Sequence, residues 1–346
     1  MTAESITSAP DAQPFAFFRG RSVLVTGGTG SFGRAFTKAL LRHGRPQRLV
    51  IFSRDELKQT EMSDEMAPLD RDGALRFFIG DVRNPRRLLL ALRGIQLVVH
   101  AAAMKQVPVA EYNPLECIHT NVLGAENVVQ SSLDAGVERV IAVSTDKAVS
   151  PINLYGASKL CAEKIFVASN NLGGATGTRF SVVRYGNVLG SRGSVIPVFR
   201  RLVANGADHL PITDPRMTRF WITLDDGVAF VASSLARMRG GEIFVPKIPS
   251  MKIVELARAL APHLEQRTTG IRPGEKLHEV LITGDEARNT RDVGDRFLIE
   301  PALEFWRSSG EAPGKAVPDD FSYASDQNDR WLTAPELLKL LDGAAG

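Results

Sequence analysis

The residues best suited to chemistry lie within Ser144–Lys159, where four ionisable side chains occur in fourteen positions. Asp146 and Lys147 are adjacent, and Tyr155 and Lys159 are four residues apart. Residues four apart share one face of a helix, so the second pair can act together. A lysine ammonium stabilises phenolate, which lowers the tyrosine pKa and lets the tyrosine remove a proton from an alcohol. The alternative is a surface tyrosine and a surface lysine on an amphipathic helix.

Alcohol oxidation alone does not need Asp146 and Lys147. Once a hydroxyl becomes a ketone, the neighbouring C–H is acidic and a hydroxyl beta to the ketone can be eliminated. That step needs one group to take the carbon-bound proton and another to protonate the departing oxygen. Lys147 suits the first role if burial or a cation such as Lys105 depresses its pKa, and Asp146 suits the second if it is held protonated. The alternative is a salt bridge on a loop.

Short apolar runs that alternate with helical patterns must position these side chains, and they predict an α/β fold with a parallel, doubly wound sheet. Because right-handed crossovers bring the carboxyl ends of parallel strands to one edge, the reactive stretch emerges where ligands bind. Strands are expected at Ser22–Thr26, Arg48–Phe52, Arg76–Ile79, Leu97–His100, Arg139–Val143 and Phe180–Arg184.

A glycine-rich turn joins the first expected strand to a helical pattern over Arg34–His43. This order of strand, turn and helix is the setting that a dinucleotide-binding fingerprint requires. Glycines let backbone N–H groups approach a pyrophosphate, and the helix N-terminus adds partial positive charge. A purely structural turn is the alternative. The cofactor contacts expected from this turn are Gly27, Thr29, Gly30, Ser31, Phe32 and Gly33.

The second strand is followed by Ser53, Arg54 and Asp55, with Lys58 one helical turn further on. An NAD site usually has an acidic side chain here on the ribose 2′-hydroxyl, whereas serine and guanidinium suit a 2′-phosphate. The pattern favours NADP, unless Arg54 faces solvent and Asp55 takes the ribose. Further cofactor contacts are expected after the third and fourth strands, from Asp81, Val82, Ala101, Ala102 and Lys105.

Composition argues against nucleic-acid binding and a membrane span. The 346 residues are 44% hydrophobic and 23% charged, with a net charge of only +3. No apolar run approaches the roughly 18–20 residues that a span needs. The two cysteines lack metal-ligand spacing and fit a reducing compartment, so no metal site is expected and a cytoplasmic protein is the default.

Three parts of the chain are expected. Residues 1–20 are Ala/Ser/Pro-rich, lack the regions of a signal peptide, and are interpreted as a mobile leader. Residues 21–184 are the NADP-binding Rossmann domain. Residues 185–346 are mainly a smaller, mixed α/β substrate-binding lobe, with some segments returning to the Rossmann domain. Within the lobe, Glu304–Asp320 is expected to be an irregular connection.

The pattern Thr26-Gly27-x-x-Gly30-x-x-Gly33 with Tyr155-x-x-x-Lys159 resembles extended short-chain dehydrogenases/reductases acting on nucleotide sugars. From about Val23 to Arg330 the chain is similar to one family among them, the inverting UDP-N-acetylglucosamine 4,6-dehydratases (5-epimerising) that begin pseudaminic acid synthesis. The matching stretches are Ser53–Lys58, Ser144–Ala148, Pro151–Tyr155, Arg184–Asn187, Met217–Trp221 and Ile271–Glu279.

The resemblance implies a mechanism for UDP-N-acetylglucosamine. Tyr155 and NADP⁺ oxidise C4, Lys147 removes the C5 proton, and Asp146 assists loss of the C6 hydroxyl as water. Hydride returns to C6, and reprotonation of C5 from the opposite face gives the 4-keto-6-deoxy L-arabino sugar, so NADP is recycled. The implied substrate contacts are Lys105, Lys147, Asn187, Val195, Thr213, Arg272 and Glu275.

Other activities remain as alternatives. Ordinary hexose-nucleotide 4,6-dehydratases carry Asp-Glu at Asp146-Lys147, and membrane-bound retaining relatives carry Met at Tyr155. A nucleotide-sugar 4-epimerase would use Tyr155 and Lys159 but leave Lys147 idle, and a non-catalytic NADP-binding sensor would need none of them. The resemblance also implies a homo-oligomer. Flagellin glycosylation and a surface polysaccharide would demand the same first enzyme.

Overall fold

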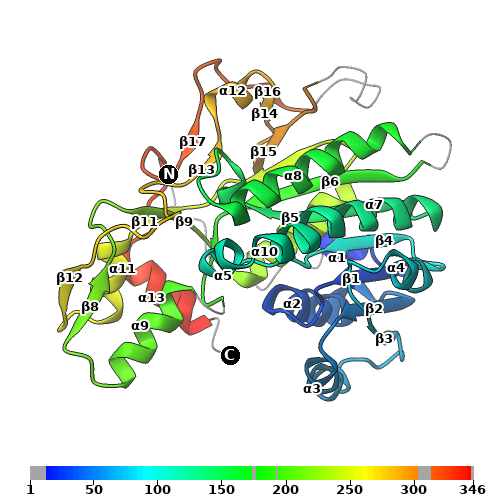
Figure 1. The fold of residues 1–346 in the computed structure, drawn as a ribbon, viewed down its shortest axis with the longest axis horizontal. Helices are drawn as coiled ribbons and strands as arrows, with labels where there is room; N and C mark the ends of the chain where they lie inside the picture. Colours follow the sequence, from blue (N-terminus) through cyan, green and yellow to red (C-terminus); the bar gives the residue numbers. More distant parts are fainter. Residues whose placement is uncertain (1–12, 174–176, 192–193, 303–312, 344–346) are drawn as a thin grey trace.

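A ten-stranded sheet dominates the computed structural model, which describes residues 13–173, 177–191, 194–302 and 313–343 (Figure 1). Its parallel strands follow the order β3-β2-β1-β4-β5-β6-β10. The predicted doubly wound, mostly parallel sheet is confirmed. These strands are β1 (Ser22–Thr26), β2 (Arg48–Ser53), β3 (Leu75–Ile79), β4 (Leu97–His100), β5 (Arg139–Thr145), β6 (Arg179–Tyr185) and β10 (Ile243–Pro246).

Helices cover both faces of the sheet, which is why strands such as β1 and β2 are almost wholly apolar and buried. On one face α8 packs on β5 and β6 and is flanked by α7 and α4, while α10 and α2 lie on the other (Figure 1). These helices are α2 (Ser31–Ala39), α4 (Pro85–Leu92), α7 (Gly124–Asp134), α8 (Leu154–Ala168) and α10 (Leu224–Arg237). Smaller helices are α3 (Glu56–Met66), α5 (Val107–Tyr112), α6 (Pro114–Ile118), the π-helical η1 (Leu40–Gly44) and η2 (His119–Leu123), and the 3-10 turns η3 (Asp146–Ala148) and η4 (Ser169–Asn171).

The strand order reverses between β1 and β4, because the chain continues to β2 on one side and to β5 on the other. Ligands of open α/β sheets bind at such a switch point, beyond the carboxyl ends of the strands. Thr26 and His100 end these two strands and face each other, with 2.8 Å between Thr26 Oγ1 and His100 Nδ1. β5 ends beside them, so η3 and the start of α8 lie at the same edge.

Part of the expected leader belongs to the core. α1 (Gln13–Ala16) packs against α10, and the side chains of Phe15 and Phe18 are fully buried. The expectation of a mobile leader is therefore wrong for residues 13–20, because two aromatic side chains anchor them. Residues 1–12 lie outside the described residues.

The second half of the chain builds a smaller lobe with its own core, which includes Trp221, Leu256 and Leu337 (Figure 1). A three-stranded sheet in the order β11-β9-β7 and a two-stranded sheet of β12 and β8 form its strands. The lobe comprises β7 (Asn187–Val188), α9 (Val195–Ala204), β8 (His209–Ile212), β9 (Thr218–Ile222), β11 (Ser250–Lys252), α11 (Ile253–Leu260), β12 (Glu265–Thr268) and α13 (Ala334–Gly343).

Several later segments extend the large sheet or pack at its end. Antiparallel β15 pairs with β10, followed outward by β14 and β16. Of the expected irregular connection, residues 303–312 lie outside the described residues and the rest includes the short β16. None of the helices in the described ranges is long and apolar enough to cross a membrane. The segments are β13 (Val280–Ile282), α12 (Gly284–Ala287), β14 (Thr290–Asp292), β15 (Arg296–Ile299), β16 (Lys315–Ala316) and β17 (Tyr323–Ala324).

Candidate active site

The glycine-rich turn after β1 lies directly against the residues that follow β4. Gly27 has φ of +65°, and a Cβ added there would lie 2.8 Å from Cα of Ala102. A Cβ on Gly33 would overlap the carbonyl oxygen of Gly28. Gly30 is the N-cap of α2, which begins at Ser31. The turn therefore has room for backbone only, as a dinucleotide cradle requires.

The side chains expected at the cofactor ribose lie at the end of β2. Asp55 is the N-cap of α3: its Oδ1 accepts from the backbone N of Lys58 at 3.0 Å, and its Oδ2 is 2.5 Å from Lys58 Nζ. Both carboxylate oxygens are therefore engaged locally. Ser53 is buried, and its hydroxyl accepts from Gln59 Nε2 at 3.1 Å. The Arg54 side chain is 57% exposed.

The further cofactor contacts expected after the third and fourth strands have partners within the protein or lie at its surface. Burial acts to raise the pKa of Asp81, but Arg83 at 2.8 Å and Arg54 at 3.5 Å outweigh it and lower the pKa. Val82 is buried, and its carbonyl accepts from Asn127 Nδ2. After β4, Ala101 and Ala102 are partly buried, whereas Lys105 is exposed; in the turn, Thr29 is buried and Phe32 stacks on Phe36.

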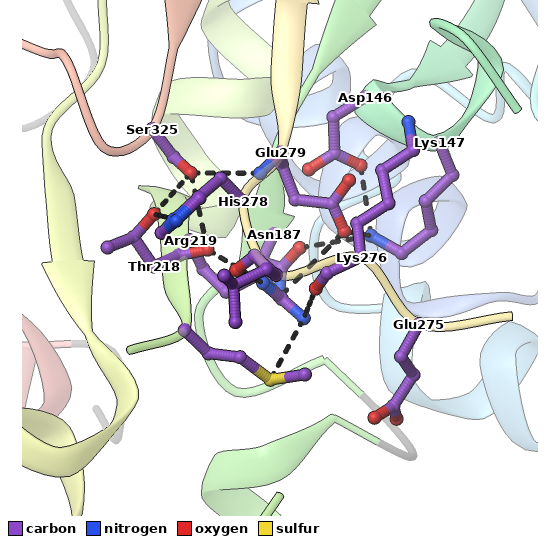
Figure 2. Close-up of polar contacts among 12 residues, drawn as sticks. Asp146, Lys147, Asn187, Thr218, Arg219, Glu275, Lys276, His278, Glu279 and Ser325 are labelled. Atoms are coloured by element: carbon purple, nitrogen blue, oxygen red, sulfur yellow. Dashed lines mark hydrogen bonds and ion pairs between the residues drawn. The ribbon is translucent and has the colours of Figure 1, made fainter. Parts of the chain in front are cut away.

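Lys147 lies at the centre of a polar cluster drawn from three parts of the chain (Figure 2). Its Nζ is 3.0 Å from Oδ1 of Asp146, 3.3 Å from Oε1 of Glu279 and 3.4 Å from Oδ1 of Asn187. Burial acts to lower the pKa of Lys147, but the carboxylates of Asp146 and Glu279 outweigh it and raise the pKa. A depressed pKa was the condition set for Lys147 as a base, and it is not met, because Asp146 and then Glu279 stabilise the ammonium form.

The turn after β5 aims Asp146 and Lys147 into this cluster. Thr145 caps the 3-10 turn, accepting from the backbone N of Lys147 at 3.3 Å and donating to Oδ1 of Asp146 at 2.9 Å. Asp146 is fully buried. Its Oδ2 and Oε2 of Glu279 lack a hydrogen-bond partner among the residues that the structure describes. Buried acceptors of this kind can be satisfied by the hydroxyls of a bound sugar.

Tyr155 and Lys159 both lie on α8 near its N-terminus, but they are held differently. Burial raises the pKa of the partly exposed Tyr155 to about 12, and the charge of Lys147 opposes this shift. Lys159 is buried and donates to the carbonyl of Val143 at 2.8 Å. Burial lowers the pKa of Lys159 to about 8, opposed by Glu163. The expectation that Lys159 lowers the Tyr155 pKa is therefore wrong: burial raises this pKa, and the charge that opposes the rise is that of Lys147.

A loop before β13 is fastened to the start of α8 and completes the site. Asn153, the N-cap of α8, donates to the carbonyl of Gly274 at 2.8 Å, and Lys276 donates to the carbonyl of Val149. Arg272 is 69% exposed, with Nη1 3.8 Å from Oε1 of Glu275. Of the other expected substrate contacts, Val195 begins α9 and Thr213 follows β8; both are partly buried in the smaller lobe.

The sequence interpretation missed three charged residues of the site, namely Arg219, Lys276 and Glu279. Arg219 Nε is 3.8 Å from Oε1 of Glu279. The available signal was the density of charge within Arg272–Glu279, but nothing in the sequence pairs that loop with β5. No cluster of three potential metal ligands occurs in the part of the chain that the structure describes.

The sheet, the glycine-rich turn and a Tyr–Lys pair on one helix define an extended short-chain dehydrogenase/reductase. Residues 23–301 match the family model of polysaccharide biosynthesis proteins. The chain is 52% identical over 336 residues to UDP-N-acetylglucosamine 4,6-dehydratase (inverting) of Campylobacter jejuni strain 81-176, covering 95% of this chain and 99% of that protein. The chain belongs to the family of inverting UDP-N-acetylglucosamine 4,6-dehydratases, and it is an enzyme of the hydro-lyase class.

Other similar proteins include one named for a different activity and one whose structure was solved with nucleotides bound. Pen from Bacillus thuringiensis has a TM-score of 0.86 and 34% identity, covering 95% of this chain and 99% of that chain. DesIV, a dTDP-glucose 4,6-dehydratase from Streptomyces venezuelae with NAD and TYD bound, has a TM-score of 0.65 and 28% identity, covering 74% and 86%. UDP-glucose 4-epimerase of Rickettsia akari is 42% identical, covering 94% and 96%. The fold and the turn, with an NAD-bound neighbour, support a nicotinamide cofactor for this chain.

Proposed function

We propose that this enzyme dehydrates UDP-N-acetylglucosamine across C5 and C6 after oxidation at C4, with inversion at C5. The product is UDP-2-acetamido-2,6-dideoxy-β-L-arabino-hex-4-ulose, the first intermediate of pseudaminic acid synthesis. The observation that carries the proposal is the contact of 3.0 Å between Lys147 and Asp146, beside the helix that holds Tyr155. It provides a second acid–base pair beyond the one that oxidation needs.

Each side chain has a step that suits its chemistry. Tyr155 takes the proton from the C4 hydroxyl. Lys147 gives its own proton to Asp146, 3.0 Å away, and the free amine then takes the proton from C5, which the C4 ketone makes acidic. Asp146, protonated by that transfer, gives a proton to the C6 hydroxyl, which leaves as water. Return of a proton to C5 from the opposite face then inverts that carbon.

The residues at the switch point fit a dinucleotide, since side chains are excluded at Gly27 and Gly33. A nicotinamide held there would supply the acceptor for hydride from C4 and the donor of hydride to C6. We assign NADP rather than NAD because both oxygens of Asp55 are engaged by Lys58, while the Arg54 side chain is 57% exposed, with Nη1 3.5 Å from Asp81 Oδ2. A guanidinium pairs well with a phosphate.

The loop before β13 and the smaller lobe supply groups for the UDP moiety. Arg272 is exposed and chemically suited to a diphosphate or a ribose, and Glu275 has a buried oxygen without a partner among the described residues, which suits a ribose diol. Asn187 contacts Lys147 and so lies at the sugar end. We assign Lys105, Val195 and Thr213 to the same substrate.

The relatives named UDP-glucose 4-epimerases make epimerisation the second candidate. A 4-epimerase does not need Lys147, so the variant Lys147→Ala separates the two reactions. For a dehydratase we expect loss of product formation by about 10²- to 10⁴-fold, the usual contribution of an acid–base group. Lys339→Ala, at an exposed site on α13, is the control. Unchanged turnover in Lys147→Ala, or a product that keeps its C6 hydroxyl, would establish the epimerase instead.

Exposed apolar side chains on the helices beside α8 support a homo-oligomer. Tyr112 is 87% exposed, Leu115 66% and Leu123 43%, and these residues lie on α5, α6 and η2. Monomeric proteins rarely leave large contiguous apolar patches exposed. We propose a second copy of this chain as the partner, and light scattering of the purified protein gives the number of copies.

A further inference from the structure

The Lys147 amine has two acidic neighbours, and only Asp146 belongs to the stretch that carries the chemistry. The other, Glu279, immediately precedes β13 and reaches the amine from a different part of the chain (Figure 2). Its Oε1 is 3.3 Å from Lys147 Nζ, and its side chain is 3% exposed. Burying a carboxylate is costly unless it is paired, so its placement against Lys147 requires a reason.

The carboxylate of Glu279 is not needed to anchor its loop, because the backbone is held separately. The backbone N of Glu279 donates to Ser325 Oγ at 2.9 Å, and the backbone N of Ser325 donates to the carbonyl of Glu279 at 2.8 Å. The next residues form β13, which pairs with β17. The side chain is therefore positioned by a rigid frame and points from it toward the amine.

Arg219 approaches the same oxygen of Glu279 that contacts Lys147. Its guanidinium donates to the carbonyls of Lys276 at 2.9 Å and Leu277 at 3.1 Å, and its Nε is 3.8 Å from Oε1 of Glu279. Charges thus alternate from Arg219 through Glu279 and Lys147 to Asp146.

We propose that Glu279 is a positioning residue that fixes both the place and the charge state of the Lys147 amine. Its importance for turnover rests on the proposed function, whereas its effect on the amine does not. The other charged or titratable groups that face this amine are Asp146 from η3, Tyr155 from α8, Arg219 from β9 and Lys276 from the loop before β13.

The direct test is competitive acetylation of the folded protein with a trace of acetic anhydride, read by mass spectrometry over a range of pH. The midpoint is the pH at which the acetylation rate of a lysine reaches half of its maximum. The midpoint of Lys147 is compared with that of the exposed Lys339 in the same sample. Access of the reagent changes the rate but leaves the midpoint unchanged. Glu279→Gln keeps the shape and removes the charge, and we expect it to lower the Lys147 midpoint by about one to three pH units.

Two further variants complete the design. Glu286→Gln removes a carboxylate that pairs with Arg184 at 3.1 Å and leaves Glu279 in place, so the Lys147 midpoint should not move. Glu279→Asp keeps the charge, and the midpoint should stay above that of Lys339. If Glu279→Gln does not fold, the wild-type comparison still decides, since a Lys147 midpoint at or below that of Lys339 overturns the inference.

A second readout uses turnover. One limb of the pH–rate profile reports the ionisation of Lys147, whether Lys147 acts as amine or as ammonium. In Glu279→Gln this limb should move to lower pH by the same amount as the labelling midpoint. A midpoint and a profile that both stay in place overturn the inference. A midpoint that moves in a protein without dehydratase activity overturns the proposed function and leaves the role of Glu279 supported.

Discussion

Lys147 is the residue on which the choice between reactions depends. In the proposed mechanism Tyr155 is the base for oxidation at C4, a step that a dehydratase and an epimerase would share. Elimination of the C6 hydroxyl needs a further pair, and we propose Asp146 and Lys147, whose side chains are 3.0 Å apart, for that role. The carboxylates that hold the Lys147 amine also raise its pKa, so position and pH dependence are linked.

The first prediction concerns pH. In the proposed mechanism Tyr155, whose pKa is raised to about 12, and Lys147, whose pKa is raised above its ordinary value, both act in their deprotonated forms. The deprotonated fraction of each grows with pH below its pKa, so product formation should rise from about pH 7 to pH 10. Initial rates measured with saturating substrate and cofactor check this. An optimum below pH 7 would contradict the assigned roles.

The second prediction concerns the cofactor. Arg54→Ala should weaken NADP binding by about 10- to 100-fold, because a hydrogen-bonded charge pair contributes roughly 1.5–3 kcal/mol. NAD binding should change little, since NAD has no 2′-phosphate. Titration calorimetry with both nucleotides gives the comparison, and Arg93→Ala, on an exposed residue after α4, is the control. Equal losses for the two nucleotides would disprove the assignment of Arg54.

At the scale of elements, the ends of β1 and β4 form the floor of the cofactor site. Gly27 brings the turn against Ala102, and Thr26 Oγ1 accepts from the backbone N of Ala102 at 3.3 Å. The same hydroxyl contacts the ring of His100. The ends of β1 and β4 are therefore held together by close backbone contact and by the buried hydroxyl of Thr26.

Gly27→Ala tests the backbone requirement. The added Cβ would meet Ala102, and the positive φ adds a strain of about 1–3 kcal/mol, so we expect both stability and NADP binding to be lost. Gly94→Ala is the matched control, because Gly94 has φ of +71° and nothing within 4 Å of an added Cβ. It should lose a similar strain energy in thermal unfolding while keeping its NADP affinity. Normal NADP affinity in Gly27→Ala would contradict the assignment of the glycine-rich turn to cofactor binding.

His100 makes stability depend on pH. Burial, with a smaller effect of Lys159, lowers its pKa to about 3, so the folded protein keeps the ring neutral where the unfolded chain protonates it. The contribution is complete above the unfolded pKa of about 6.5 and is lost as pH falls toward 3, by up to about 5 kcal/mol. The free energy of unfolding, measured with urea at several pH values, should fall less steeply with decreasing pH in His100→Asn than in the wild type. The exposed His263→Asn should keep the wild-type slope, and equal slopes for all three proteins would exclude His100 as the cause.

At the scale of the whole molecule, local patterns were sufficient for the first six parallel strands. Buried apolar runs and a glycine-rich turn have a period or a spacing that the chain itself displays, and β1 to β6 lie where these predicted them. Three further strands were missed, because each is only three or four residues long and gains its place from distant pairing: β10 pairs with β6, β15 with β10, and β14 with β15. Glu279 was missed for the same reason, since its partner Lys147 is distant in sequence.

We propose that the two halves of the chain cooperate: the first half places Tyr155, Asp146 and Lys147, and the later half places Glu279 and most of the residues assigned to the substrate. The measurement that tests it most directly is NMR of the product formed from UDP-N-acetylglucosamine in D₂O without added reductant. The account predicts a 4-keto-6-deoxy sugar of L-arabino configuration with deuterium at C5. A product with hydrogen retained at C5, or with the original C5 configuration, would contradict it.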